Sequence, residues 1–179
     1  MLINNAAAAP RKRQETPEGI ELQFATNVLG YFWMTQFFSE VLKRSAPSRV
    51  VNVASTYAGD LDLNDLEFKR RRYNTHTAYR QSKQANRMLT VAFAGRLKPF
   101  GVSVNACHPG VVPSKLSRDM GAHGSDTPDE GARTPVWLAT SPLGRQETGK
   151  FFSNMKESVC RFCENEQAIE RLYLICTSY

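Results

Sequence analysis

Two long stretches of the chain carry apolar residues at the spacing of an amphipathic helix. Between residues 20 and 42 apolar side chains recur at steps of three and four, and residues 78–97 form a second helical segment that ends before a Lys-Pro-Phe-Gly sequence. Residues 16–18 (Thr-Pro-Glu) offer an N-cap, a first-turn proline and a favourable negative charge. We therefore expect the first helix to start there and to stop before residues 45–47 (Ser-Ala-Pro).

Short β-branched runs alternate with the helices. Residues 49–54 have little polar alternation, which is typical of a strand buried on both faces. Residues 2–3, 102–106 and 150–152 are further predicted strands. A capping box at residues 127–130 opens a helix to about residue 140, and residues 165–176 form a last helix, whereas residues 111–126 are expected to be a mobile loop. This order predicts an α/β fold over residues 1–179 as one domain, with right-handed crossovers and a mostly parallel sheet.

Size and composition narrow the class of protein. The chain has 179 residues, 41% of them hydrophobic, which excludes collagen-like and wholly disordered chains. Its net charge of +6 and pI near 9.3 permit an anionic partner without naming one. Four irregularly spaced cysteines, with neither a signal peptide nor a membrane span in the pattern, predict reduced thiols in an intracellular protein.

Polar residues stand at the carboxyl ends of the predicted strands, where ligands bind in parallel sheets: residues 4–6, Ser55 and residues 108–110. Tyr79 and Lys83 lie four positions apart in a predicted helix and so share one face. A nearby ammonium favours the phenolate and lowers the pKa of a tyrosine from ~10, which would suit a general acid/base near neutral pH. Taken alone, the pair fits an ordinary solvated helix face equally well.

Five segments, in order along nearly the whole chain, resemble motifs of the short-chain dehydrogenase/reductase family. They are residues 4–7 (Asn-Asn-Ala-Ala), 26–27 (Thr-Asn), 51–55 (Val-Asn-Val-Ala-Ser), 79–83 (Tyr-Arg-Gln-Ser-Lys) and 108–114 (His-Pro-Gly-Val-Val-Pro-Ser). The insert at residues 60–66 and the sequence of residues 79–86 are similar to the retinol-dehydrogenase-like branch. The resemblance implies a Rossmann-like, three-layer α/β fold.

The resemblance also implies the roles of particular residues. Tyr79 is expected to be the general acid/base, Lys83 to lower its pKa and hold the nicotinamide ribose, and Ser55 to hydrogen-bond the substrate oxygen. Asn27 is expected to hold a water of the proton relay. Besides Tyr79 and Lys83, the expected cofactor-binding residues are Asn5 and Ala6 on the adenosine side, and Pro109, Gly110, Val112 and Ser114 beside the nicotinamide amide. Ser114 stands where the family usually has Thr, and Ala7 where it has Gly.

The Gly-rich phosphate loop of the family has no counterpart in these residues. The chain starts at what resembles the family's fourth strand, so the expected fold is an incomplete Rossmann-like domain. The strand at residues 2–3 and nearby apolar helix faces would then lack their cover, which favours association. A catalytically inactive form that acts only as a binding or dimerisation partner is therefore the alternative to an active enzyme.

Other motifs suggest weaker hypotheses. Cys160 and Cys163 have zinc-knuckle spacing but no second ligand pair, so ordinary thiols are preferred to a metal site. The basic run at residues 69–72 fits a solvated loop better than a phosphate-binding one, and we expect no nucleic-acid partner. His108 adjoins Pro-Gly, which favours a structural or cofactor-edge role over catalysis. The sequence contains no Gly-x-Ser-x-Gly elbow, which argues against a Ser/His hydrolase.

The sequence thus predicts an oxidoreductase that transfers hydride between an alcohol and a carbonyl with NADP or NAD. The positive net charge slightly favours NADP. The resemblance implies an apolar small-molecule substrate such as a retinoid, steroid or lipid aldehyde. Homodimer formation stays open, as does a cytoplasmic or membrane-associated location.

Overall fold

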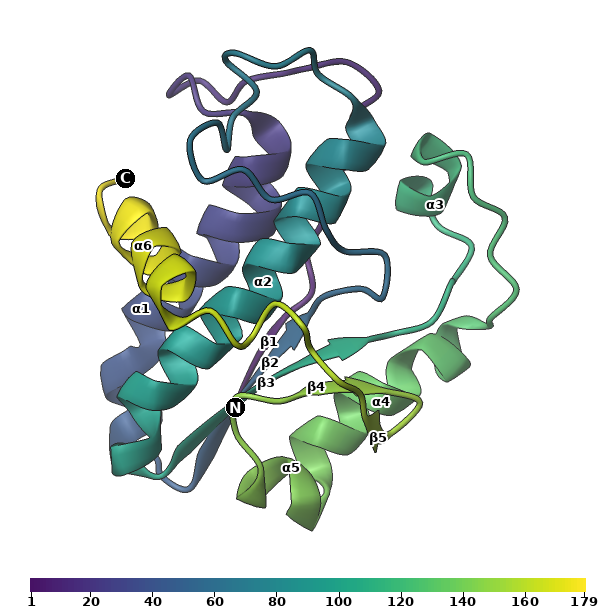
Figure 1. Ribbon diagram of the computed structural model, residues 1–179. Helices are drawn as coiled ribbons and strands as arrows, with labels where there is room; N and C mark the ends of the chain where they lie inside the picture. The colour runs from purple at the N-terminus through teal and green to yellow at the C-terminus, as the bar shows by residue number, and fades with distance from the viewer.

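The computed structural model describes all 179 residues as one twisted sheet between two layers of helices (Figure 1). The strands lie side by side in chain order, the first four parallel and the fifth antiparallel to the fourth. They are β1 (Leu2–Asn4), β2 (Ser48–Val53), β3 (Val102–His108), β4 (Phe151–Ser153) and β5 (Lys156–Glu157). The predicted α/β class with a mostly parallel sheet is confirmed.

The helices divide between the two faces of this sheet. A π-helical segment, η1 (Phe24–Leu29), leads into α1 (Gly30–Arg44), and α2 (Thr75–Leu97) continues into the short η2 (Lys98–Phe100). The remaining helices are α3 (Lys115–Asp119), α4 (Pro128–Thr140), α5 (Pro142–Gln146) and α6 (Glu166–Thr177). Figure 1 shows α1, α2 and α6 on one face and α4 and α5 on the other.

Successive side chains of a strand point to opposite faces of the sheet, so each strand contributes to the hydrophobic core on either face. Val50 packs into the large cluster with α1, α2 and α6, and its neighbour Val51 packs with Leu138 of α4 on the other face. The connection from β3 to β4 through α4 therefore has the opposite hand to the two connections before it. The prediction that every crossover is right-handed is wrong at this one.

The first long helix begins later than predicted. Gly19 has a positive φ of 81°, and the Leu22 N–H bonds to the Gln14 carbonyl, so the chain turns back at residues 16–19. The carboxylate of Glu21 then takes the capping role, accepting the N–H groups of Gln23 at 2.9 Å and Phe24 at 2.7 Å. Thr16 stabilises a turn and does not cap a helix.

Other boundaries also differ from expectation. The α2 helix starts at Thr75, with Asn74 as its side-chain cap, and the loop expected to be mobile contains α3. Neither α5 nor β5 was evident in the apolar pattern, since both are too short for a period to show. The predicted capping box of α4 is confirmed by reciprocal hydrogen bonds between Thr127 and Glu130.

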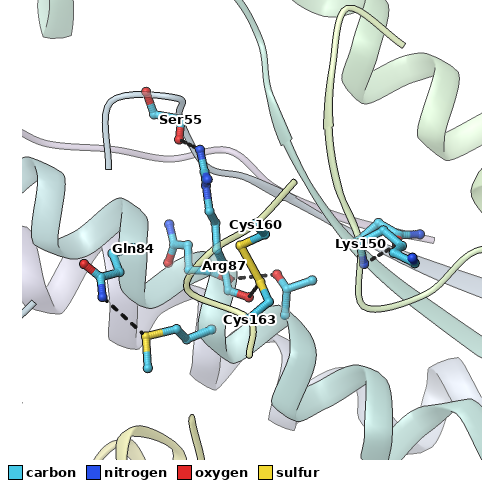
Figure 2. The surroundings of a disulfide bond; sticks show 10 residues. Ser55, Gln84, Arg87, Lys150, Cys160 and Cys163 are labelled. Carbon is cyan, nitrogen blue, oxygen red and sulfur yellow. Dashed lines mark hydrogen bonds between the residues drawn. A yellow bond between two sulfur atoms is a disulfide. The ribbon is translucent and has the colours of Figure 1, made fainter. Parts of the chain in front are cut away.

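Cys160 and Cys163 form a disulfide in the turn before α6 (Figure 2). The turn brings their Cα atoms to 5.5 Å, within the range that a disulfide spans. The prediction of reduced thiols is wrong for this pair, whereas Cys107 and Cys176 are free and buried. None of the helices combines the length and the apolar character that crossing a membrane requires.

Candidate active site

A cavity of about 340 Å³ opens at the carboxyl ends of β2 and β3. Ser55, two residues after β2, and Tyr79, in the second turn of α2, both line it. His108 ends β3 and forms another part of the wall. Apolar side chains from the segment that contains α3 complete the lining, among them Val111, Val112, Leu116, Met120 and Ala122. The structure thus brings three polar side chains, distant in sequence, to one mostly apolar pocket.

The Ser55 hydroxyl is oriented by its local main chain. Its Oγ accepts the N–H of Tyr57 at 3.0 Å, which leaves the hydroxyl proton free to donate into the pocket. The Tyr57 ring stacks on the ring of Tyr79 with centroids 6.5 Å apart. Burial raises the pKa of the Tyr79 phenol, and the Ser55 hydroxyl beside it only partly opposes that rise. The expected lowering of this pKa is therefore not present in the protein alone.

Lys83 lies behind Tyr79 and is only 2% exposed. Its Nζ donates to the Val53 carbonyl at 2.9 Å and lies 5.6 Å from the centre of the Tyr79 ring. Burial lowers the pKa of this ammonium to about 8. An ammonium has three donors, and Val53 is the only protein acceptor here, so two N–H groups remain to bind the hydroxyls of a ligand.

Asn27 is completely buried in the π-helical segment. Its Oδ1 accepts the N–H of Ala8 at 2.8 Å, and its Nδ2 donates to the Ala8 carbonyl at 2.9 Å and to Ser82 Oγ at 3.1 Å. The side chain therefore ties the loop after β1 to the helix that carries Tyr79 and Lys83. Single π-helical turns within α-helices often occur at functional sites, because they redirect a side chain. The relay-water role of Asn27 stays a prediction.

A second hollow of about 490 Å³ adjoins the pocket. Asn5 and Val53 lie on one side of it and α4 on the other, and it shares Pro109, Val112 and Ser114 with the pocket. Ala6 is exposed but is not part of this lining. The two hollows lie within the volume range of ligand sites, and their shared wall is the segment expected to face a nicotinamide.

The segment between the two hollows has a defined conformation. Gly110 has a φ of 98°, and a Cβ at this position would lie 2.5 Å from the Asp126 carboxylate. That carboxylate accepts the N–H of Val111 and so holds the turn. The hydroxyl of Ser114 accepts the N–H of Ser117 at 3.1 Å and caps α3. The Ser114 hydroxyl is therefore already used as a helix cap, and the turn at residue 110 requires glycine.

Two residues around the site were missed in the sequence. Tyr31 donates its phenol proton to the same Val53 carbonyl that Lys83 binds, at 3.2 Å. Arg87 donates to the main-chain carbonyl of Ser55. Each stands four positions after a predicted site residue, Asn27 or Lys83, and so faces the same side of its helix. Extending the helical spacing by one step would have identified both.

Comparison with known proteins agrees with this arrangement. Residues 1–124 match the family model described as short chain dehydrogenase. The chain belongs to the short chain dehydrogenase family. It is 36% identical to retinol dehydrogenase 13 of Homo sapiens, an alignment that covers 97% of this chain and 58% of that protein. The predicted resemblance to the family and to its retinol-dehydrogenase-like branch is confirmed, and the chain spans less than two thirds of this relative's length.

Solved structures show the same fold. A protein from Mycobacterium paratuberculosis superposes with a TM-score of 0.75 at 27% identity, over 99% of this chain and 66% of that one. NADPH-bound carbonyl reductase from chicken fatty liver superposes with a TM-score of 0.60 at 26% identity, over 84% of this chain and 61% of that one.

Proposed function

We propose that this short chain dehydrogenase carries out NAD(P)-dependent hydride transfer between an alcohol and a carbonyl. The observation that carries the proposal is the placement of Ser55 and Tyr79 on one apolar pocket, with the ammonium of Lys83 buried behind the Tyr79 ring. Membership of the family and the names of its relatives support the same reaction class.

The geometry supports a definite division of labour for carbonyl reduction. The Ser55 hydroxyl donates a hydrogen bond to the substrate oxygen and holds it beside Tyr79. A nicotinamide, when bound, supplies the hydride that forms the new C–H bond. The Tyr79 phenol gives its proton to the same oxygen, and the phenolate left behind is reprotonated from solvent. The phenol is protonated at neutral pH, which is the state that this direction requires, and burial raises its pKa further.

Lys83 and the second hollow fit the nicotinamide half of the cofactor. The two free donors of Lys83 would bind the ribose hydroxyls, and the positive charge would favour the Tyr79 phenolate in the oxidative direction. Asn5, Pro109, Gly110, Val112 and Ser114 would line the path of the cofactor. NADP is preferred to NAD on two grounds, the net charge of +6 and the NADPH bound by a solved relative.

The substrate class follows from the character of the pocket wall. Leu116, Met120 and Ala122 contribute apolar surface to the pocket, and no carboxylate, ammonium or guanidinium group lines it. Burial lowers the pKa of the His108 imidazole, so this side chain is neutral at neutral pH. Such a wall favours an apolar alcohol or aldehyde over a charged one. A retinoid, a steroid or a lipid aldehyde fits this description, and the retinol dehydrogenase relatives support the first.

The test begins with fluorescence titration of the purified chain with NADPH and NADH, followed by turnover of retinal and a fatty aldehyde. Tyr79→Phe removes only the phenol oxygen, so we expect kcat to fall about 100-fold or more with an unchanged Kd for NADPH. Tyr57→Phe is the matched control, because Tyr57 lines the same pocket and stacks on Tyr79 but transfers no proton. A wild-type chain that binds neither cofactor, or an active Tyr79→Phe variant, would contradict the proposal.

A second candidate function is that of an inactive association partner. The outer face of α1 supports it, since Phe37 is 79% exposed and Trp33, Met34 and Val41 are at least 40% exposed along the same helix. Sedimentation over a range of concentrations tests it, with Phe37→Glu expected to abolish association. Val159→Glu, at an apolar position that is 87% exposed far from α1 in sequence, is the control. A monomer at every concentration would exclude this candidate.

A further inference from the structure

Arg87 is a buried arginine on the same face of α2 as the predicted catalytic residues. It follows Tyr79 by two helical steps of four and Lys83 by one, and it is only 6% exposed. Its guanidinium lies 3.5 Å from the centre of the Phe151 ring and 5.7 Å from that of Phe162. Arg87 does not line the pocket, so it has no place among the residues that would touch substrate.

The far end of this side chain holds the main chain of Ser55. Figure 2 shows Arg87 extending from α2 to Ser55, where one terminal nitrogen donates to the Ser55 carbonyl. The hydrogen bonds between β2 and β3 run as far as the N–H of Ala54, which bonds to the Cys107 carbonyl at 2.8 Å. Ser55 is thus the first residue beyond that ladder, and Arg87 supplies a donor to its carbonyl where the sheet no longer does.

Stability alone does not account for a cation at this position. Arg87 forms no ion pair with a carboxylate, and its Nε has no hydrogen-bond partner. The nearby charge that acts on it is that of Arg161, and burial followed by this repulsion lowers the pKa of its guanidinium to about 10. Burying an unpaired cation is unfavourable, and an apolar side chain would pack between the two phenylalanine rings without that cost.

The cover over Arg87 comes from the turn that carries the disulfide. Phe162 stands between Cys160 and Cys163, and the Sγ of Cys163 lies 4.0 Å from the Arg87 main-chain carbonyl. Figure 2 shows the disulfide beside the base of the Arg87 side chain. The guanidinium is therefore enclosed by β4 on one side and by this turn on the other, which limits it to the direction of Ser55.

We propose that Arg87 is a positioning residue that holds the main chain of Ser55 and thereby orients the Ser55 hydroxyl toward the phenol of Tyr79 and the substrate oxygen. The proposal rests on the function proposed above. It adds a residue that reaches neither substrate nor cofactor. Two contacts then define the serine: Arg87 binds its carbonyl, and the Tyr57 N–H binds its hydroxyl oxygen.

The first test needs no turnover. Arg87→Met keeps an unbranched side chain between the rings but removes the donor, so we expect amide hydrogen exchange at Tyr57 to accelerate about tenfold. Arg87→Lys retains a cationic hydrogen-bond donor and should give an intermediate rate. Arg96→Met is the matched control, because Arg96 stacks on the Tyr173 ring at 3.7 Å on the same helix without contacting Ser55. Unchanged exchange at Tyr57 in both Arg87 variants would overturn the proposal.

The second test separates positioning from binding. In Arg87→Met we expect kcat for the aldehyde to fall about tenfold or more while the Kd for NADPH is unchanged, since only the serine is displaced. Arg87→Lys should recover part of kcat, and Arg96→Met should retain all of it. A kcat equal to that of the wild type in Arg87→Met would refute the role. If the wild-type chain transfers no hydride, the proposed function fails, and the exchange experiment alone decides whether Arg87 holds Ser55.

Discussion

Replacement of Lys83 by methionine is expected to stabilise the fold at neutral pH. The ammonium is buried, and its pKa falls from 10.5 to about 8 on folding. While the lysine is protonated in both states, burial of its charge disfavours the folded state. As the pH rises through the folded pKa, the folded protein releases the proton before the unfolded chain does, so stability rises with pH.

The size of this effect follows from the two pKa values. A change from 10.5 to about 8 corresponds to roughly 3 kcal/mol of unfavourable free energy at about pH 7. The hydrogen bond from Lys83 to the Val53 carbonyl offsets ~1 kcal/mol of it. Lys83→Met should therefore raise the free energy of unfolding by about 2 kcal/mol at about pH 7, and this advantage should shrink by about 2 kcal/mol at about pH 9.5.

Urea unfolding of both proteins at the two pH values measures the difference directly. Comparison with the variant cancels the titration of all groups that do not interact with Lys83. Cys107 does interact with it, but burial raises the pKa of that thiol to about 12, so it stays protonated over this range. A gap between the two proteins that is equal at both pH values would refute the reasoning, since Lys83 would then titrate alike in the folded and unfolded states.

Two further changes test the framework around the site. Asn27→Ala removes the three side-chain hydrogen bonds to Ala8 and Ser82, so it should lower the free energy of unfolding by about 2–4 kcal/mol in urea titration; a loss below ~1 kcal/mol would show that the loop after β1 is held by other contacts. Asp65 accepts the N–H groups of residues 69–71, and although burial opposes this, these bonds hold the pKa of its carboxyl below the usual value. The stability that the Asp65 carboxylate contributes is present at neutral pH and is lost as the pH falls through that lowered pKa. Asp65→Asn should therefore lower the free energy of unfolding by ~1–3 kcal/mol at neutral pH and by less in acid. An equal loss at both pH values would count against this role.

The residues at the strand ends were predictable because local signals agreed with one another. The apolar run around Val51 predicts a buried strand, so Ser55 was expected at its carboxyl end. The spacing of Tyr79 and Lys83 placed both residues on one helix face. The capping box at Thr127 likewise specified the start of α4. The helix start predicted at Thr16 was wrong although its neighbours carry a local helix signal. The turn at Gly19, where φ is positive, delays the helix, and the carboxylate of Glu21 caps it instead.

By itself, then, the amino-acid sequence determined the class of fold, the order of its longer elements and the four side chains around which a reaction can be argued. Periodicity and capping act over a few residues and can be read locally. Only the tertiary structure decided that Tyr79 is buried enough for its pKa to rise, that Lys83 keeps two donors free, and that Arg87 reaches from α2 to the main-chain carbonyl of Ser55. Burial and contacts between distant residues set these properties, and neither is encoded in the spacing along the chain.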